Sequence, residues 1–190
     1  MKSIILMGIK HCGKSTQAKL LGKEFKMPVY DTDNLIEDET GFSPREIFTN
    51  DGEAAFKEAE AQACAHLKEE LLKSGKSAVI ATGGGIGNNT GAVEILKSLG
   101  ICVFLKTDEK IAADRIVNEA SVLPDGSIKN LPAYIAKKNP RSISEVREIF
   151  HAFHEERTKI YSTVADITVD MANAPRWFNT KQIVEALENR

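Results

Sequence analysis

The feature that most constrains the fold is a glycine-rich segment near the start of the chain. Residues Gly8 to Ser15 read G-I-K-H-C-G-K-S, which matches the phosphate-binding pattern G-x-x-x-x-G-K-S/T at every fixed position. An apolar run over 4–7 precedes it, as a buried parallel strand would, and apolar residues at helical spacing follow over 16–26. This order of strand, loop and helix favours a nucleoside triphosphate site over a chance glycine turn before a helix.

The chemistry of triphosphate binding explains the spacing of this phosphate-binding loop. Glycine adopts backbone conformations that other residues avoid, so backbone N–H groups can surround phosphate oxygens at the start of the helix. Lys14 is predicted to reach the β- and γ-phosphates, and the Ser15 hydroxyl to bind Mg²⁺. The motif says little about which molecule receives the phosphate. The nucleotide-binding residues predicted here are Gly8, His11, Cys12, Gly13, Lys14, Ser15 and Thr16.

Length and charge limit the remaining possibilities. The 190 residues predict one domain spanning 1–190, and the net charge of −2 argues against a general nucleic-acid binder. No apolar run approaches the about 18 residues of a membrane span, and the apolar start is too short for a signal peptide. The three cysteines lack a C-x-x-C spacing and predict reduced thiols in a cytoplasmic protein. Cys12, inside the loop, is either reactive or a small tolerated side chain.

Two carboxylates follow the second predicted strand, which ends at residues 29–31. Asp31 and Asp33 stand one residue apart and open a helix through Ile36. Ligands gather at the carboxyl ends of strands in open α/β sheets, where such a pair suits metal and hydroxyl chemistry. The alternative is helix capping by Asp33. The phosphate-binding loop in the same chain favours the functional pair.

A third strand, predicted over 77–82, ends in three consecutive glycines. Gly83, Gly84 and Gly85 are more than a turn requires, and they would let a ligand approach backbone N–H groups closely. A flexible loop is the alternative. The helix predicted over 51–73 carries Glu53, Lys57 and Glu60 in its first turns, a pattern typical of a solvated face, although this helix start could also face the cleft.

The remaining pattern alternates short apolar runs with amphipathic segments. It predicts five parallel strands with helices on both faces, an α/β fold of the P-loop nucleoside-triphosphate-hydrolase type. Residues 119–144 break this pattern with three prolines and no clear strand character, and we expect them to form a mobile lid. His151 and His154 share a helix face but lack a third metal ligand in the sequence. The other predicted elements are a short helix over 45–49, helices over 90–99, 108–118, 145–162 and 181–188, strands over 101–105 and 165–169, and a loop over 170–179.

These motifs, in this order, resemble the shikimate kinase family of small P-loop kinases over nearly the whole chain. The family pattern D-x-D-x-x-I-E stands at 31–37, and I-F followed by G-E-x-x-F and a later glutamate stands within 47–60. The glycine triplet ends a strand at 83–85, and R-x-x-x-Y-x-x-x-A-D stands at 157–166. Several ordered motifs are far more specific than the phosphate-binding loop alone.

The resemblance implies a role for each matching residue. Lys14 would act on the phosphates, with Asp31 near Mg²⁺ together with Ser15, and Asp33 would bind the acceptor hydroxyl as base or orienter. The acceptor pocket would include Asp33, Lys57, Gly83, Gly84, Gly85 and Arg157, and the adenine would lie between Arg115 and Pro175. Arg157 would pair with the acceptor carboxylate, a planar fork meeting a planar anion.

Two departures from the family pattern bear on activity. Lys57 stands where the family has an arginine, and lysine cannot make the bidentate fork. The lid has Ser121-Val122-Leu123-Pro124 where the family has R-P-L-L, whose arginine approaches the transferring phosphate. Arg141 and Arg147 are candidates to replace it.

The sequence therefore predicts a cytoplasmic, monomeric, Mg²⁺-dependent kinase that moves the γ-phosphoryl of ATP to a hydroxyl of shikimate, with no nucleic-acid or membrane partner. A kinase for another small hydroxy acid or sugar acid is one alternative. A catalytically impaired nucleotide-binding module that acts through a partner is the other.

Overall fold

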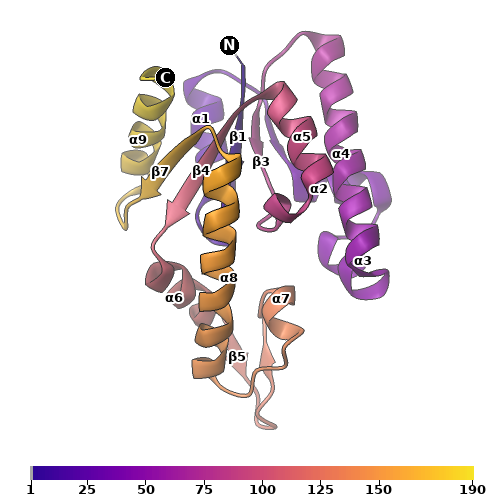
Figure 1. Ribbon diagram of the computed structural model, residues 1–190, viewed down its shortest axis with the longest axis vertical. Helices are drawn as coiled ribbons and strands as arrows, with labels where there is room; N and C mark the ends of the chain where they lie inside the picture. Colours follow the sequence, from indigo (N-terminus) through magenta and orange to yellow (C-terminus); the bar gives the residue numbers. More distant parts are fainter. Residues whose placement is uncertain (1) are drawn as a thin grey trace.

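A five-stranded parallel sheet forms the centre of the computed structural model, which describes residues 2–190 (Figure 1). The strand order is β2-β3-β1-β4-β7. The expected α/β fold with five parallel strands is confirmed. The strands are β1 (Ser3–Met7), β2 (Val29–Asp31), β3 (Val79–Ala81), β4 (Gly100–Thr107) and β7 (Ile167–Met171).

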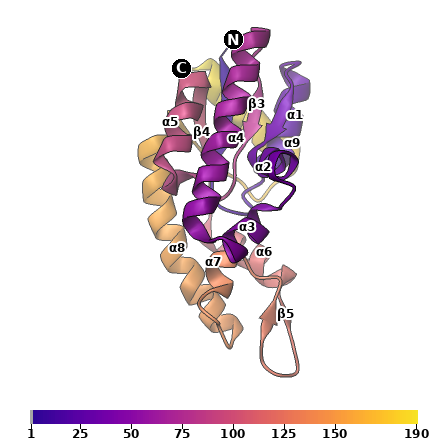
Figure 2. The same cartoon turned by 90° about the vertical axis from the view of Figure 1, so that its right-hand side faces the viewer.

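Helices cover both faces of the sheet, as predicted. Figure 2 shows α1 (Lys14–Glu24) and α9 (Arg176–Glu188) on one face and α5 (Thr90–Leu99) and α8 (Ile143–Val164) on the other. Every residue of β1 is buried, because this central strand is covered on both faces. Three further helices pack together beside β2 and α5: α2 (Thr32–Thr40), α3 (Pro44–Asn50) and α4 (Gly52–Ser74).

A smaller group of elements lies beyond the carboxyl ends of the strands (Figure 1). It contains α6 (Glu109–Glu119), β5 (Ser121–Val122), β6 (Ile128–Lys129) and α7 (Ala133–Ala136). The expectation that 119–144 lacks strand character is wrong, since β5 and β6 pair as an antiparallel hairpin. Two-residue strands are too short for an alternating pattern to be visible in the sequence.

The chain end also differs from the sequence prediction. The predicted strand over 165–169 lies two residues later, at Ile167–Met171, and the predicted loop over 170–179 is wrong because α9 already begins at Arg176. Pro175 is the N-cap of this helix. A proline at a helix start is compatible with helix formation, so Pro175 does not prevent a helix from beginning at the next residue.

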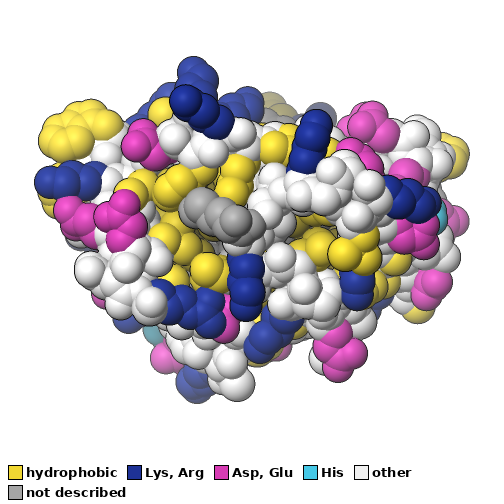
Figure 3. Space-filling model, turned by 90° about the horizontal axis from the view of Figure 1, so that it is seen from above, with side chains coloured by type: hydrophobic (Ala, Val, Ile, Leu, Met, Phe, Trp, Pro, Cys, Tyr) yellow, Lys and Arg dark blue, Asp and Glu magenta, His cyan; other side chains and the backbone are white. Residues whose placement is uncertain are grey.

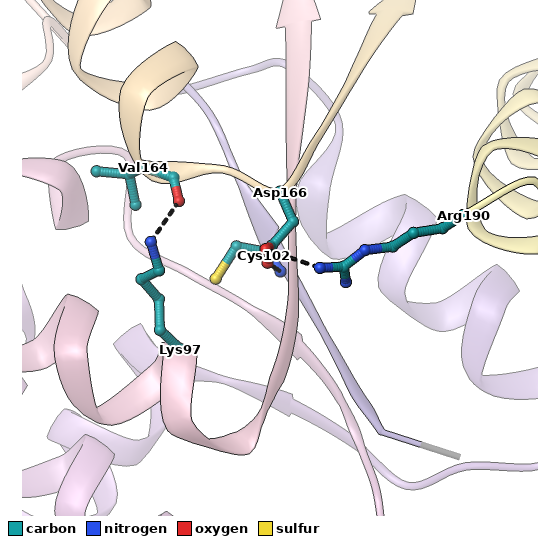
Figure 4. A network of polar contacts seen from close by, with 5 residues as sticks. All are labelled: Lys97, Cys102, Val164, Asp166 and Arg190. Carbon is teal, nitrogen blue, oxygen red and sulfur yellow. Dashed lines mark hydrogen bonds and ion pairs between the residues drawn. The ribbon is translucent and has the colours of Figure 1, made fainter.

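Asp166 explains where β7 starts (Figure 4). Its backbone N–H donates to the Cys102 carbonyl at 2.8 Å, and its carboxylate accepts from the Cys102 N–H at 2.9 Å. The guanidinium of Arg190 pairs with the same carboxylate at 3.0 Å. Asp166 therefore joins β7 and the chain end to β4, which is a structural role remote from the phosphate-binding loop.

The face drawn in Figure 3 lies at the amino ends of the strands, away from that loop. Lys and Arg side chains on this face are interspersed with Asp and Glu side chains around apolar ones. The face is therefore not uniformly basic, as a surface for nucleic acid would be. Within residues 2–190, no helix is long and apolar enough to cross a membrane.

Candidate active site

The phosphate-binding loop is held open by backbone conformations that its sequence permits. Gly8 has a φ of 148° and Gly13 a φ of 100°, both in the region that favours glycine. Gly13 is also the N-cap of α1, and no side chain caps this helix start. The first backbone N–H groups of α1 are therefore available to an anion.

Lys14 closes the loop on itself. Its ammonium donates to the carbonyls of Gly8 at 2.9 Å and Ile9 at 2.8 Å, and it lies 3.7 Å from Cys12 Sγ. The side chain is almost fully buried. Lys14 is thus held against the loop that is predicted to surround a phosphate.

Helix α6 is tied to this loop through His11. The Arg115 guanidinium donates to the His11 carbonyl at 2.6 Å, and His11 Nε2 lies 3.4 Å from a Glu119 carboxylate oxygen. Burial lowers the pKa of His11, against the opposing charge of Glu119. The predicted residues His11 and Arg115 are thus brought together, with the Arg115 guanidinium against the loop.

The two predicted carboxylates have different environments. Asp31 caps α2 by accepting from the Asp33 N–H at 3.1 Å, and it also accepts from the Ser15 hydroxyl at 2.8 Å. The capping alternative for Asp33 is therefore wrong, because the cap is Asp31. The Asp33 carboxylate faces the cavity, and partial burial and the nearby Asp31 raise its pKa.

The glycine triplet joins the sheet to the loop. Gly83 donates its N–H to Thr32 Oγ1 at 2.9 Å, and a side chain at Gly83 would lie 2.8 Å from an Asp33 carboxylate oxygen. A side chain at Gly84 would lie 2.9 Å from the backbone nitrogen of Lys10. These close approaches explain why glycine is needed here and disfavour the flexible-loop alternative.

Arg157 lies on the other side of the triplet. Its guanidinium donates to the Gly84 carbonyl at 2.7 Å, and the Tyr161 hydroxyl donates to the same carbonyl at 3.0 Å. The guanidinium also stacks 4.5 Å from the Tyr134 ring centre and 5.5 Å from that of Phe153. A fixed, partly desolvated guanidinium of this kind is suited to a carboxylate.

Glu60 is buried beneath the triplet, whereas the sequence pattern indicated a solvated position. One of its oxygens accepts from Asn89 Nδ2 at 3.0 Å, and the other is buried without a hydrogen-bond partner. Burial is the main cause that raises the pKa of Glu60, to about 7, and Asp33 adds to the rise. Gly83 separates the two carboxylates.

One cavity of about 520 Å³ is lined by many of these groups, whereas Glu60, Gly83 and Arg115 lie outside its lining. It is lined by the loop and the start of α1, by both aspartates, by Gly84 and Gly85, and by Arg157. Its far wall is apolar and comes from α3, α4 and the segment that precedes α8. The lining residues that the sequence prediction missed are Lys10, Pro44, Arg45, Phe48, Phe56, Thr82, Leu131, Pro132, Ala133 and Tyr134.

Some predicted residues lie outside the lining of this cavity. The Lys57 ammonium pairs with Glu53 at 2.9 Å on the surface of α4. Arg147 pairs with Asp114 at 2.6 Å, and the Arg141 backbone N–H donates to Glu145. Pro175 sits at the start of α9, where the next carbonyl accepts from Gln17 on α1.

The two histidines of α8 have separate partners and do not form a three-ligand metal site with another side chain. His151 pairs with Glu109 at 2.9 Å, and a ring nitrogen of His154 lies 3.0 Å from the Thr107 carbonyl. Among residues 2–190, no group of three or more His, Cys, Asp or Glu side chains could hold a metal ion by itself. Asp31 and Ser15 remain the pair that could share Mg²⁺ with a phosphate ligand.

Comparison with known proteins decides the family. The family model described as shikimate kinase matches residues 10–188. The chain belongs to the shikimate kinase family. It is 32% identical over 190 residues to a shikimate kinase of Bacillus mycoides (strain KBAB4), covering 100% of this chain and 98% of that protein. A shikimate kinase of Aquifex aeolicus (strain VF5) is 32% identical over 188 residues, covering 97% of this chain and 95% of the relative.

Solved members of the shikimate kinase family share the fold. A shikimate kinase from Acinetobacter baumannii, solved in complex with shikimate, superposes with a TM-score of 0.77 at 26% identity. That match covers 100% of this chain and 95% of the other. The Aquifex aeolicus enzyme superposes with a TM-score of 0.71 at 32% identity, covering 98% of this chain and 96% of the other.

Proposed function

We propose that the protein transfers the γ-phosphoryl group of ATP to a hydroxyl of shikimate. The observation that carries this proposal is one cavity that several suitable groups line. At one side lies the start of α1 at the phosphate-binding loop, which no side chain caps. The same cavity is lined by the Asp33 carboxylate, by glycines of the triplet and by the fixed Arg157 guanidinium. The first two features suit a triphosphate and a hydroxyl acceptor, and Arg157 suits a carboxylate on the acceptor. The relative solved with shikimate supports this choice of acceptor.

The nucleotide is assigned to the side of the cavity formed by the loop. The loop residues Gly8, His11, Cys12, Gly13, Lys14, Ser15 and Thr16 bind the phosphates in this proposal, and Arg115 and Pro175 flank the adenine. When ATP enters, Lys14 exchanges its bonds to the carbonyls of Gly8 and Ile9 for bonds to phosphate oxygens. Arg115 keeps the loop in place from α6 through its bond to the His11 carbonyl.

The residues present fit a magnesium ion. The Ser15 hydroxyl and the Asp31 carboxylate lie 2.8 Å apart, which matches the preference of Mg²⁺ for oxygen ligands shared with phosphates and water. Ser15 would hold the ion directly in this proposal, and Asp31 would hold it through water. The ion supplies charge neutralisation at the phosphates.

The acceptor is assigned to the glycine side of the cavity. Asp33 accepts the proton of the attacking hydroxyl, Gly84 and Gly85 leave room for the ring, and Arg157 holds the carboxylate. Gly83 and Lys57 remain part of the proposed acceptor site, with Gly83 beneath Asp33 and the Lys57 ammonium first released from Glu53. Catalysis rests on positioning and charge neutralisation more than on covalent chemistry.

The proposal includes a lid, a location and an assembly state. Residues 119–144 close over the nucleotide to exclude water, since an open site would hydrolyse ATP. All three cysteines are buried free thiols, which supports a reducing, cytoplasmic location. We infer a single-domain monomer.

An acceptor panel tests the proposal. Purified protein with ATP and Mg²⁺ is given shikimate or one of a set of other hydroxy acids and sugar acids, and ADP release is followed. Shikimate is expected to give the highest kcat/KM, with kcat at a kinase-like value of about 1–100 s⁻¹. An acceptor with a higher kcat/KM would replace shikimate as the proposed substrate. ATP binding with no acceptor-dependent ADP would instead favour an impaired nucleotide-binding module.

A further inference from the structure

Four cationic side chains line the cavity, and two of them have fixed partners. Lys14 is bonded to loop carbonyls and Arg157 to the Gly84 carbonyl. The side chains of Lys10 and Arg45 have no hydrogen bond or ion pair with any residue in 2–190. Arg45 lies on α3 beside the apolar wall and also lines a neighbouring cavity of about 410 Å³. Lys10 is therefore the unpaired cation of the phosphate-binding loop itself.

The position of Lys10 is fixed by the close contact between the loop and the glycine triplet. A side chain at Gly84 would come within 2.9 Å of the Lys10 backbone nitrogen, so the two segments touch there. The positive charge of Lys10 is near enough to Asp33 to counteract the rise in the pKa of that carboxyl. Lys10 therefore lines the cavity where the phosphate-binding loop meets the glycine triplet, with its charge acting on Asp33.

No lysine or arginine of residues 119–144 lines this cavity, and Lys137 lies over the Phe48 ring, 5.8 Å from its centre. The residues of 119–144 that line the cavity are Leu131, Pro132, Ala133 and Tyr134, none of which is charged. Arg147 is held by Asp114 at 2.6 Å. The transferring phosphoryl group spreads negative charge over three equatorial oxygens, so a cation at that point favours the transition state.

We propose that Lys10 is a catalytic residue whose ammonium binds an equatorial oxygen of the phosphoryl group during transfer. The bond between the γ-phosphorus and the oxygen bridging it to the β-phosphate breaks, and ADP keeps that electron pair. The acceptor oxygen forms the new bond to phosphorus, and its proton goes to Asp33. Lys10 keeps its own protons throughout. The acceptor in this inference rests on the proposed function, whereas the contact with the phosphoryl group does not.

The proposal predicts a different kinetic effect for Lys10 than for a residue that only attracts ATP. A cation that binds the ground state and the transition state equally changes KM, whereas one that binds as charge shifts during transfer changes kcat. Removing a single preorganised donor at a transition state lowers kcat by about 10²- to 10³-fold. Lys10→Met is therefore expected to lower kcat by at least about 10²-fold, with KM for ATP changed by less than about 3-fold.

The test uses Lys10→Met, Lys10→Arg and the control Lys19→Met. Lys19 is exposed on α1 and, like Lys10, has no partner among the described residues. For each variant, kcat and KM are measured, together with the affinity for Mg·ADP in the presence and absence of aluminium fluoride. Aluminium fluoride imitates the transferring phosphoryl group and needs no acceptor. The Lys10→Met variant should bind Mg·ADP like wild type but lose the tighter binding that aluminium fluoride gives, and Lys10→Arg should recover most of it.

Two results would overturn the inference. One is an undiminished effect of aluminium fluoride on Mg·ADP binding by Lys10→Met. The other is an equal loss of Mg·ADP affinity with and without fluoride, which would mean ground-state binding only. Failure of shikimate as an acceptor for wild type would leave the fluoride measurement intact, so the two proposals fail independently. Near-UV circular dichroism of each variant distinguishes lost contact from lost folding.

Discussion

Glu60 is the residue at which burial and charge are most clearly opposed. It sits within α4 with 1% of its surface exposed, and only one of its two oxygens has a hydrogen-bond partner. An isolated charge in such a place is costly, so the neutral form is favoured. Its pKa of about 7, against an ordinary value of 4.5, follows from this burial.

The raised pKa of Glu60 predicts a pH-dependent stability. The folded protein binds this proton more tightly than the unfolded chain, so the free energy of unfolding falls as pH rises from 4.5 to about 7. Glu60→Gln keeps an acceptor for Asn89 and removes the titration. The free energy of unfolding of the variant minus that of wild type is measured by urea unfolding at pH 5 and pH 8. This difference should be larger at pH 8, by up to about 3 kcal/mol.

The matched control for this titration is Glu58→Gln, an exposed glutamate on the same helix. Its unfolding free energy should follow wild type at both pH values. Parallel pH profiles for Glu60→Gln and wild type would show that the Glu60 carboxyl titrates as it does in the unfolded chain.

At this scale the sequence could locate residues fixed by motifs but not those fixed by packing. The patterns predicted Lys14, Asp31 and Gly84 as site residues, and the structure brings these three into the lining of one cavity. Glu60 was interpreted as a surface charge, because contacts with Asn89 and the glycine triplet, which are distant in the sequence, bury it. Lys10 occupies a variable position of the loop motif, so the motif itself says nothing about its side chain.

At the scale of elements, helix starts connect the fold to the site. Asn89 caps α5 by accepting from the Ala92 N–H at 3.3 Å. Its amide also donates to the Lys57 carbonyl at 2.8 Å and to Glu60 at 3.0 Å. One side chain thus joins the starts of two helices below the glycine triplet.

This double role predicts an unusually large cost for Asn89→Ala. Loss of an N-cap costs about 1 kcal/mol, and leaving the buried Glu60 carboxyl with one partner fewer adds about 1–3 kcal/mol. Ser43 caps α3 in an exposed capping box and is the control, with about 0.5–2 kcal/mol expected for Ser43→Ala. Chemical unfolding of both variants measures the difference. Equal losses would mean that the Asn89 amide adds nothing beyond its cap.

Element boundaries were predictable where capping signals are local. The short helix predicted over 45–49 lies within α3, whose start has a capping box at Ser43, and the helix over 90–99 agrees with the structure. Helix α9 begins at Arg176, directly after its N-cap Pro175 and before the predicted start at residue 181. The hairpin β5–β6 was missed because each of its strands has only two residues.

At the scale of the whole molecule, the predicted lid reaches the acceptor side through Tyr134. This residue of α7 stacks on the Arg157 guanidinium and lines the cavity. Because a residue of the predicted lid contacts the proposed carboxylate-binding arginine, we expect lid position to be coupled to acceptor binding. The segment would then act on the acceptor as well as cover the nucleotide.

Tyr134→Ala tests this coupling. Loss of a cation–π contact of about 0.5–2 kcal/mol should raise KM for shikimate by about 2- to 30-fold, because Arg157 loses its stacking partner. ATP hydrolysis without acceptor should rise as the lid closes less well. Steady-state kinetics measure both. Tyr134→Phe keeps the ring and should behave as wild type. An unchanged KM for shikimate in Tyr134→Ala would mean that lid position and acceptor binding are not coupled.

The central claim is that the γ-phosphoryl group passes to shikimate within the one cavity. The most direct measurement gives wild type and Lys14→Ala γ-labelled ATP, Mg²⁺ and shikimate, and locates the label by mass spectrometry. The account predicts labelled shikimate phosphate from wild type, with one ADP for each product, and essentially none from Lys14→Ala. Label found only in inorganic phosphate, or equal transfer by Lys14→Ala, would contradict it.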